Sequence, residues 1–286
     1  GIAVGNVLLP GLVKRDFAKH AAMMTGLYTL AVCGGASSST AFTVPLERNV
    51  FHGQWALTLA AWAVPAAVVL LLWAPQALAA RPLPAHAQAR SGSLWHDKLA
   101  WQVTGFMGLQ SALAYIVLGW LAPLLRERGL DGAEAGYVVA VSILVQLGSC
   151  LITPSIATPC RNQRGLAVAL AVITCVAMLA FIFAPLSGRW LWAVLLGLGQ
   201  GGSFALALTI IVLRSPDAGA TAQLSAMAQG GGYILASAGP LLAGLLRGWT
   251  GSFQSSAVLF VVISLAMAWC GWGAGRHLLV KPRLQS

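Results

Sequence analysis

The sequence predicts an all-α polytopic membrane protein, and three observations lead to this fold class. Hydrophobic residues make up 58% of the chain and charged residues only 8%, whereas soluble domains are about 25% charged. The apolar residues form long uncharged runs, and a helix of roughly 20 such residues crosses a bilayer. The chain also holds 32 glycines and 11 tryptophans, which are typical of membrane helices and their interfaces. A soluble fold is therefore disfavoured.

Apolar runs between charged breaks define the expected spans. Residues 1–13 are too short to cross a bilayer before Lys14 is reached, so we expect the chain to begin inside a helix whose start is missing. Eight complete spans are expected after it, at residues 22–45, 55–74, 101–125, 136–157, 165–185, 190–213, 222–246 and 252–274. Asp131 followed by Glu134 indicates the capped start of the helix that holds span 136–157.

Basic residues indicate the orientation of these spans, because Lys and Arg collect in cytoplasmic loops. One alternate set of breaks holds twelve of the 17 Lys and Arg: Lys14, Arg15, Lys19, Arg81, Arg90, Lys98, Arg161, Arg164, Arg214, Arg276, Lys281 and Arg283. The other set holds five: Arg48, Arg126, Arg128, Arg189 and Arg247. We therefore expect the first set and the C-terminus to be cytoplasmic. The net charge of +10 then belongs to loops, and no basic stretch is dense enough to predict nucleic acid as a partner.

Residues 75–100 form the longest break, and three prolines lie within its first ten residues. Proline interrupts helices, so a continuous helix is not expected in this break. It is typical of a linker between two membrane halves.

Groups that perform acid–base or metal chemistry are missing from the expected spans. None of the eight contains Asp, Glu, Lys, Arg or His, and no two of the five cysteines form a C-x-x-C pair. An enzyme is disfavoured, since membrane enzymes need such groups, and neither a metal nor a cofactor is expected. A coupling proton would require a titratable residue at a loop edge or outside these spans.

Neutral polar residues inside the spans are the candidates for a binding site. At 100° per residue, Gln110, Ser111 and Tyr115 fall within a sector of about 140°. In span 222–246 a stripe at i+4 steps contains Ser225, Gln229, Tyr233 and Ser237. Other polar residues in the apolar runs are Asn6, Gln146, Gln200 and Ser203. Such side chains need partners in a bilayer. They could merely hold helices together, but the distribution of the set over several helices favours a neutral substrate cavity.

Glycines in two spans allow alternative interpretations. Residues 197–202 match the dinucleotide pattern G-x-G-x-x-G, but that site needs a strand before the glycines, and here they lie within a span-length run. Close helix packing explains them better. Gly230, Gly231 and Gly232 could pack in the same way, or could make spans 190–213 and 222–246 the flexing parts of a gate.

The stretch GFMGLQSALAYIVLGWLAPLLRERGLDGAEAG resembles the pattern G-x-Q-S…Y…W-L-x-P…G-L…A-G of the cyanate and 2-nitroimidazole permease branch of the major facilitator superfamily. Three further stretches agree with this branch: GNVLLPGLVKRDF with MTGLY, GLGQGGSFALALTIIVLRS, and LSAMAQGGGYILASAGPLLAGLLRGWTG. Two features depart from it. On this resemblance we expect the first three helices to be missing from the sequence, including a first-helix arginine motif, and the loop TPCRNQRG is a degenerate form of the superfamily's basic loop.

The resemblance implies a major-facilitator-type bundle of twelve helices in two six-helix halves. Residues 1–74 would be the remainder of the N-terminal half, 75–100 the central cytoplasmic loop, 101–275 the C-terminal half and 276–286 a cytoplasmic tail. It also implies that the cavity residues that bind substrate are Asn6, Gln110, Ser111, Tyr115, Gln229 and Tyr233.

We therefore expect a secondary transporter, or permease, that moves a small polar or anionic solute by alternating access. It would be a multi-pass protein of the plasma (inner) membrane, in contact with the lipid bilayer. The alternative is a polytopic receptor or scaffold that does not transport.

Overall fold

The computed structural model describes residues 9–13, 15–17, 20–79 and 93–281, and helices dominate these ranges. No β-strand occurs among the elements described, so the all-α prediction is confirmed. The chain divides into two compact units, one comprising Gly1–Leu30 with Ser91–Ser286 and the other Ala31–Arg90. Of the predicted partial span 1–13, residues 9–13 are helical and the others lie outside the described residues.

Helices α2 (Ala21–Asn49), α3 (Trp55–Ala61) and α4 (Ala63–Ala79) precede the undescribed residues 80–92. The predicted span 55–74 is interrupted at Trp62, because Pro65 has no N–H to donate to the carbonyl of Ala61. Helix α4 also continues through Pro75 to Ala79. The expected break at 75–100 was therefore placed too early at its start.

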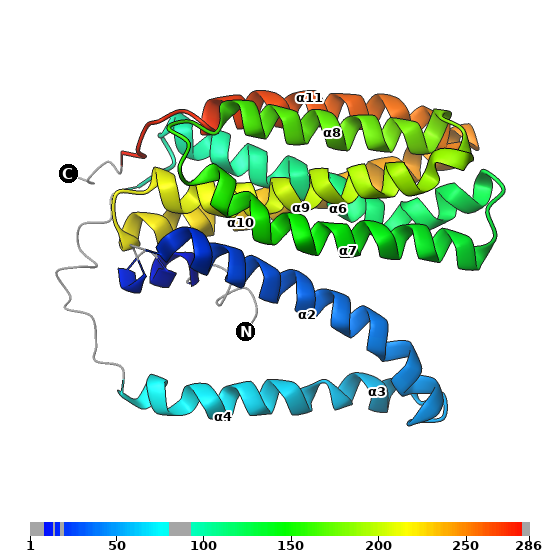
Figure 1. The fold of residues 1–286 in the computed structure, drawn as a ribbon, viewed down its shortest axis with the longest axis horizontal. Coiled ribbons are helices and arrows are strands. Elements are labelled where there is room, and N and C mark those ends of the chain that lie inside the picture. Colours follow the sequence, from blue (N-terminus) through cyan, green and yellow to red (C-terminus); the bar gives the residue numbers. More distant parts are fainter. Residues whose placement is uncertain (1–8, 14, 18–19, 80–92, 282–286) are drawn as a thin grey trace. The chain divides into compact units, whose positions relative to one another are not determined.

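Six further helices form one bundle (Figure 1). They are α6 (Lys98–Glu127), α7 (Gly132–Ala157), α8 (Arg164–Phe183), α9 (Arg189–Arg214), α10 (Ala218–Thr250) and α11 (Ser256–Ala274). The most extensive contacts in the bundle join α6 to α10 and α7 to α9, followed by those of α8 with α9 and α11 and of α6 with α11. All eight predicted complete spans fall on helices of the two groups.

Six helical segments of the described chain are long and apolar enough to cross a membrane. They are Trp55–Pro75, Lys98–Glu127, Gly132–Ala157, Arg164–Phe183, Leu186–Arg214 and Phe253–Ala274. Helix α10 has 33 residues but is not among them. Its length suffices, so its glutamines, serines and glycines are what lower its apolar character. The protein is thus a multi-pass helical membrane protein, and the expected number of eight complete spans stays a prediction.

Aspartates begin three helices of the bundle. The carboxylate of Asp97 accepts hydrogen bonds from the backbone N–H groups of Leu99 and Ala100, and Asp217 caps α10 in the same manner. Asp131 Oδ1 accepts from the N–H of Glu134 at 2.6 Å, so the predicted cap of α7 is confirmed. Such a cap satisfies backbone donors that a helix start leaves unpaired.

Loops of the bundle sort to two ends, as the predicted alternation of breaks requires. We call the end with residues 97, 157–164, 214–218 and 274–281 the tail end, and the end with residues 127–132, 183–189 and 250–256 the far end. At the far end Arg128 donates to the carbonyls of Phe181 and Ala184, at 3.0 and 2.9 Å. Two ion pairs join helices there, Glu134 with Arg189 and Glu127 with Arg247, each at 3.1 Å.

The tail end is cross-linked by a buried arginine. Arg214 is only 3% exposed, and its guanidinium donates to the side chain of Gln163 and to the carbonyl of Ala274. The backbone N–H of Gln163 donates to Gly275 at 2.9 Å, and that of Val280 donates to the Arg214 carbonyl at 2.8 Å. These bonds join the start of α8, the end of α9 and the chain after α11.

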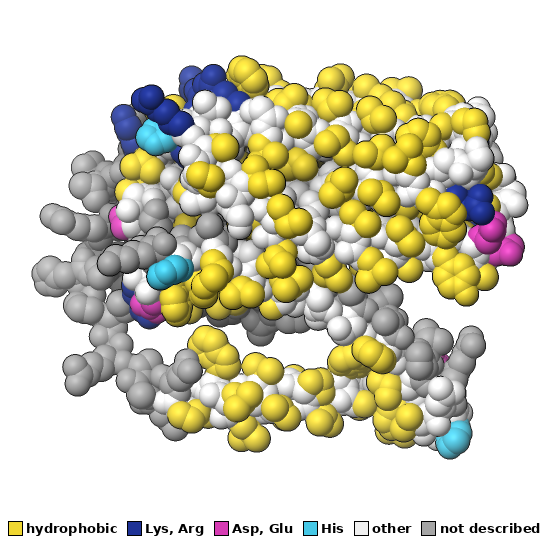
Figure 2. All heavy atoms as spheres, in the orientation of Figure 1, with side chains coloured by type: hydrophobic (Ala, Val, Ile, Leu, Met, Phe, Trp, Pro, Cys, Tyr) yellow, Lys and Arg dark blue, Asp and Glu magenta, His cyan; other side chains and the backbone are white. Residues whose placement is uncertain are grey.

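The surface of the bundle is apolar along its sides. Figure 2 shows hydrophobic side chains over the long side of α8 and α11, with Lys and Arg gathered near the helix ends on the face in view. An apolar belt between charged ends is what a bilayer requires of a spanning bundle.

The G-x-G-x-x-G glycines lie inside α9 and contact neighbouring helices on two sides. A Cβ on Gly197 would lie 2.8 Å from Val145 of α7, and one on Gly201 would meet the carbonyl oxygen of Gln146. On the other side, Gly199 lies against Thr174 and Gly202 against Leu170, both of α8. The helix-packing interpretation is confirmed for these glycines.

Helices α6 and α10 approach most closely where two glycines meet. A Cβ added to Gly108 would lie 2.8 Å from the carbonyl oxygen of Gly232, and one on Gly239 would lie 3.0 Å from Ala112. Farther along, the indole N–H of Trp120 donates to the carbonyl of Pro240 at 3.0 Å. Small residues thus let two backbones touch, as in tightly packed membrane helices. We call this contact the α6–α10 seam.

A methyl group at Gly108 should destabilise the seam. Gly108→Ala places a Cβ against the backbone of Gly232, which cannot move aside as a side chain would. We expect a loss of about 1–3 kcal/mol in unfolding free energy, as for other overpacked sites. The control is Gly119→Ala on the same helix, where nothing lies within 4 Å. Thermal unfolding in detergent compares the two, and equal midpoints would contradict the seam.

Candidate functional site

Five of the six predicted site residues lie on the two helices of the seam. Gln110, Ser111 and Tyr115 belong to α6, and Gln229 and Tyr233 belong to α10. The sixth, Asn6, lies outside the described residues. The five come from segments more than 100 residues apart in the sequence, so only the packing of α6 on α10 could bring them together.

Three side chains of α10 form a hydrogen-bonded row. The amide of Gln229 donates to Ser225 Oγ at 2.8 Å, and the hydroxyl of Tyr233 donates to Gln229 Oε1 at 3.4 Å. Their i+4 spacing places them one above another on the helix, as the sequence stripe predicted. Ser237, the next position in that stripe, is exposed and bonds to the carbonyl of Ile234 in its own helix. The row therefore ends at Tyr233.

Tyr115 connects this row to α6. The ring centroids of Tyr115 and Tyr233 are 6.4 Å apart and the rings are tilted by 54°, within the range of favourable aromatic pairs. Tyr115 is 40% exposed. The structure thus brings Tyr115, Tyr233 and Gln229 together across the seam.

Gln110 and Ser111 have a different environment from Tyr115. Each is only 4% exposed, and the amide of Gln110 donates to Ser111 Oγ at 2.7 Å and contacts the sulfur of Met107 at 3.5 Å. They form a buried polar pair inside the bundle. The predicted site is therefore two adjoining groups on α6, one facing α10 and one facing the interior.

Two polar residues of α9 were not among the predicted site residues. Gln200 and Ser203 are 6% and 1% exposed, and neither Gln200 Nε2 nor Ser203 Oγ has a hydrogen-bond partner among the described residues. The sequence shows both as polar residues within an apolar span, which was the available signal. What it does not show is that neighbouring groups leave them unpartnered.

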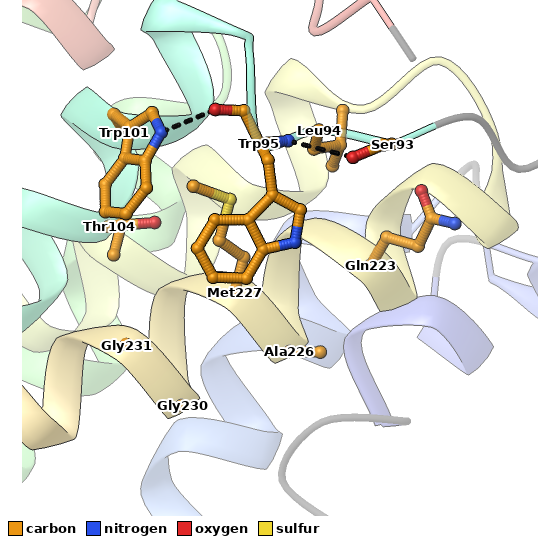
Figure 3. A pocket seen from close by; sticks show the side chains of 10 residues that line it. All are labelled: Ser93, Leu94, Trp95, Trp101, Thr104, Gln223, Ala226, Met227, Gly230 and Gly231. Carbon is orange, nitrogen blue, oxygen red and sulfur yellow. Dashed lines mark hydrogen bonds between the residues drawn. The ribbon is translucent and has the colours of Figure 1, made fainter. Parts of the chain in front are cut away.

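A hollow of about 470 Å³ lies near the tail end, beside α6 and α10 (Figure 3). Its walls contain two tryptophans in edge-to-face contact, with centroids 5.6 Å apart, and Trp101 donates to the carbonyl of Trp95 at 2.8 Å. Its lining comprises Ser93, Leu94, Trp95, Trp101, Thr104, Gln223, Ala226, Met227, Gly230 and Gly231. None of the five described site residues lines it, so this hollow is a feature that the sequence did not reveal.

The side chains gathered at the candidate site are neutral hydrogen-bonding groups. In the described part of the chain, no group of three or more His, Cys, Asp or Glu is placed to hold a metal. The side chains that meet at the seam and behind it are amides, hydroxyls and phenols. These groups donate and accept hydrogen bonds without charge.

Comparisons with known proteins bear directly on this site. No protein-family model matches the chain. It is 37% identical over 277 residues to the "Uncharacterized transporter YycB" of Bacillus subtilis, covering 96% of this chain and 69% of that protein. It is also 37% identical over 283 residues to the "2-nitroimidazole transporter" of Escherichia coli, covering 98% and 71%. The "Cyanate transport protein CynX" of E. coli is 29% identical over 254 residues, covering 88% and 65%.

The chain belongs to the cyanate and 2-nitroimidazole permease branch of the major facilitator superfamily. The resemblance drawn from its motifs is thereby confirmed. It is a secondary transporter, and the comparisons support this function over the receptor or scaffold alternative. The relatives are named as transporters, which agrees with the expectation that the protein is not an enzyme. As a transporter it acts on a small-molecule solute within the lipid bilayer.

The tyrosine pair should couple α6 to α10 energetically. In a double-mutant cycle of Tyr115→Leu and Tyr233→Leu, we expect a coupling of about 0.5–1.5 kcal/mol, the usual contribution of an aromatic contact. Unfolding in a denaturing detergent measures it. A matched cycle of Tyr115→Leu with Tyr137→Leu uses an exposed tyrosine on α7 and should give a coupling near zero. A null result for the first cycle would contradict the contact.

Proposed function

We propose that this permease of the major facilitator superfamily moves a small polar or anionic solute by alternating access. We place its binding site at Gln110, Ser111, Tyr115, Gln229 and Tyr233, with Asn6 as a further cavity residue. The observation that carries the proposal is the row of neutral polar groups that runs from Ser225 to Tyr233 and reaches Tyr115 across the seam.

Neutral groups suit a solute that must be released again. A side chain in a bilayer needs a hydrogen-bond partner, and an amide or hydroxyl can give its donor to water or to a solute in turn. A fixed charge inside the membrane would cost more free energy and would hold an ion of opposite sign tightly. Hydrogen-bond donors without charge bind an anion weakly enough to let it leave.

Relatives suggest the size and chemistry of the solute. One is named for 2-nitroimidazole and another for cyanate, and both compounds are small and carry hydrogen-bond acceptors. We infer that the solute of this protein belongs to the same range. Within the described bundle, a coupling proton would need a carboxylate near a helix end, such as Asp97, Glu127 or Glu134, because the helix interiors are neutral; a titratable residue outside the bundle is the alternative.

Motion in the transport cycle is better assigned to α10 than to α9. The glycines of α9 touch α7 and α8 on both sides, which leaves little room for bending. In α10, a Cβ on Gly230 would meet nothing within 4 Å and one on Gly231 would meet only Thr104, at 3.4 Å. Helix α10 also contains Pro240. Open glycines and a proline within one helix each favour local bending.

Loss of single polar groups should weaken uptake in proteoliposomes. For 2-nitroimidazole or cyanate, Gln110→Ala, Tyr115→Phe and Tyr233→Phe should each lower kcat/KM by roughly 2- to 10-fold, the equivalent of one hydrogen bond of about 0.5–1.5 kcal/mol. Combining Gln110→Ala with Tyr115→Phe should lower it further. Labelled-solute uptake at several concentrations measures the effect.

The matched control for uptake is Ser237→Ala, which removes an exposed hydroxyl on α10 that bonds only within its own helix. It should leave uptake unchanged. Normal uptake by the folded Gln110→Ala, Tyr115→Phe double variant would show that the site is assigned wrongly. If the unaltered protein takes up neither solute nor any other small anion or nitroheterocycle, the proposed substrate class fails.

We further propose that the protein lies in the plasma (inner) membrane with its tail end in the cytoplasm. The set of breaks that includes the loops of the tail end holds twelve of the 17 Lys and Arg, and this excess supports the orientation. The division into two membrane halves joined by a central loop belongs to the same proposal, with the start of the loop moved from residue 75 to beyond Ala79.

Labelling with a membrane-impermeant maleimide tests the orientation. Cys160 is exposed at the tail end, and Ala133 is exposed at the far end. Two single-cysteine variants are compared, one that keeps only Cys160 and one that carries only the thiol introduced by Ala133→Cys. In whole cells we expect label on the Ala133→Cys variant alone, with Cys160 reacting after permeabilisation. The reverse pattern would contradict the proposed orientation.

A further inference from the structure

Several buried donor groups of α9 are left without acceptors in the described chain, and two of them, on Gln200 and Ser203, lie in the middle of the helix. Gln200 Nε2 and Ser203 Oγ make no hydrogen bond to any described residue, although both residues are almost fully buried. They lie three positions apart and so share one face of the helix. A buried donor without an acceptor is costly, particularly in a bilayer. Natural structures retain such groups where a ligand or water completes them.

The packing of α9 determines where these donors point. At 100° per residue, Gly197 and Gly201, which contact α7, lie within about 40° of each other. Gly199 and Gly202, which contact α8, lie at about 140° to 200° from Gly197. Gln200 and Ser203 fall at about 240° to 300°, in neither sector. Besides α7 and α8, helix α9 packs on α6 and, less extensively, on α10, so we infer that the free sector faces the side where α6 lies.

The same reasoning places Gln110 on the complementary side of α6. Gly108 and Ala112 face α10, and Gly105 faces Cys270 of α11. These three lie at about 160° to 220° from Gln110 on the helix. Gln110 therefore points away from both α10 and α11, toward the side where α7 and α9 pack on α6. The Gln110 amide N–H donates to Ser111 Oγ, and its oxygen Oε1 does not accept from α9, because Gln200 Nε2 and Ser203 Oγ have no partner among the described residues.

We propose that Gln200 and Ser203 are substrate-binding residues that donate hydrogen bonds to an acceptor group of the solute. Two donors one turn apart suit a group with two acceptor atoms, such as a carboxylate or nitro group. A solute that offers only donors, such as an ammonium ion, leaves both side chains unpartnered. This inference rests on the proposed function, and it adds a wall from α9 to the cavity.

Burial of the two donors limits when they act. The solute reaches them when α6 and α9 separate, as alternating access requires of helices that line a cavity. In the present arrangement both side chains are buried, so they serve the solute only once the helices have opened.

Stability separates a binding role from a structural one. If the amide of Gln200 held the bundle together, Gln200→Leu would lower the unfolding midpoint. Because the amide makes no bond in the described chain, we expect this variant to unfold at the same temperature or higher. Its KM for 2-nitroimidazole and cyanate uptake should nevertheless rise about 10-fold, and Ser203→Ala should raise it several-fold.

Ser264→Ala is the matched control. Ser264 lies on α11, is 4% exposed, and its hydroxyl is likewise unpartnered among the described residues. Its loss should leave KM unchanged. A second comparison measures uptake of labelled cyanate with 2-nitroimidazole or imidazole added as the inhibitor. Imidazole lacks the nitro oxygens, so Gln200→Leu should weaken the inhibition by 2-nitroimidazole far more than the inhibition by imidazole.

Three results would overturn the inference: an unchanged KM in folded Gln200→Leu, a lowered unfolding midpoint that accounts for the loss, or equal KM changes in Ser203→Ala and Ser264→Ala. A failure of the proposed function looks different, because the unaltered protein would then take up neither solute.

Discussion

The backbone contact between Gly108 and Gly232 is the constraint on which the rest of the candidate site depends. Because neither residue has a side chain, α6 and α10 lie close enough for Tyr115 to reach Tyr233. Separation by even a methyl group would move the two rings apart and detach the row on α10 from α6. In a bilayer, apolar surface alone does not drive helices together, so close van der Waals packing has to supply this attraction.

The hydrogen-bonding requirements of the polar groups in the bundle are met in different ways, or left unmet, depending on their position. Those at the seam pair with one another, as Ser225, Gln229 and Tyr233 do. Charged groups at the far end form ion pairs between helices, as Glu134 does with Arg189. At the tail end, the guanidinium of Arg214 donates to backbone carbonyls and to the side-chain amide of Gln163 instead of to a carboxylate. Only a few buried groups, among them Gln200 and Ser203, have no partner in the described chain. Because these side chains make no hydrogen bond that holds the bundle together, a structural role and a binding role are most easily distinguished by substituting them.

Much of the fold could be predicted from the sequence because membrane insertion imposes a strong pattern. Uncharged runs of span length located the helices within a few residues, and Asp131 marked the start of α7. The errors came from proline. Pro65 interrupts the expected span at Trp62, while Pro75 is accommodated within α4, and the sequence does not say which proline a helix tolerates. Helix α10 was expected to be an ordinary span, yet its polar residues make it less apolar than the other helices of the bundle.

The candidate site was harder to predict than the fold, since a helical projection shows only which residues share a face. It grouped Gln110 with Tyr115, but the neighbours of α6 separate them: α10 lies beside Tyr115, and Gln110 is turned into the interior. It also gave Gln200 no special weight, because an unpartnered amide and a satisfied one look identical in a sequence. The difference arises from the glycines at 197, 199, 201 and 202, which bring α7 and α8 against two sides of α9 and leave the polar side toward α6. The small residues thus select which polar groups are left to bind a solute.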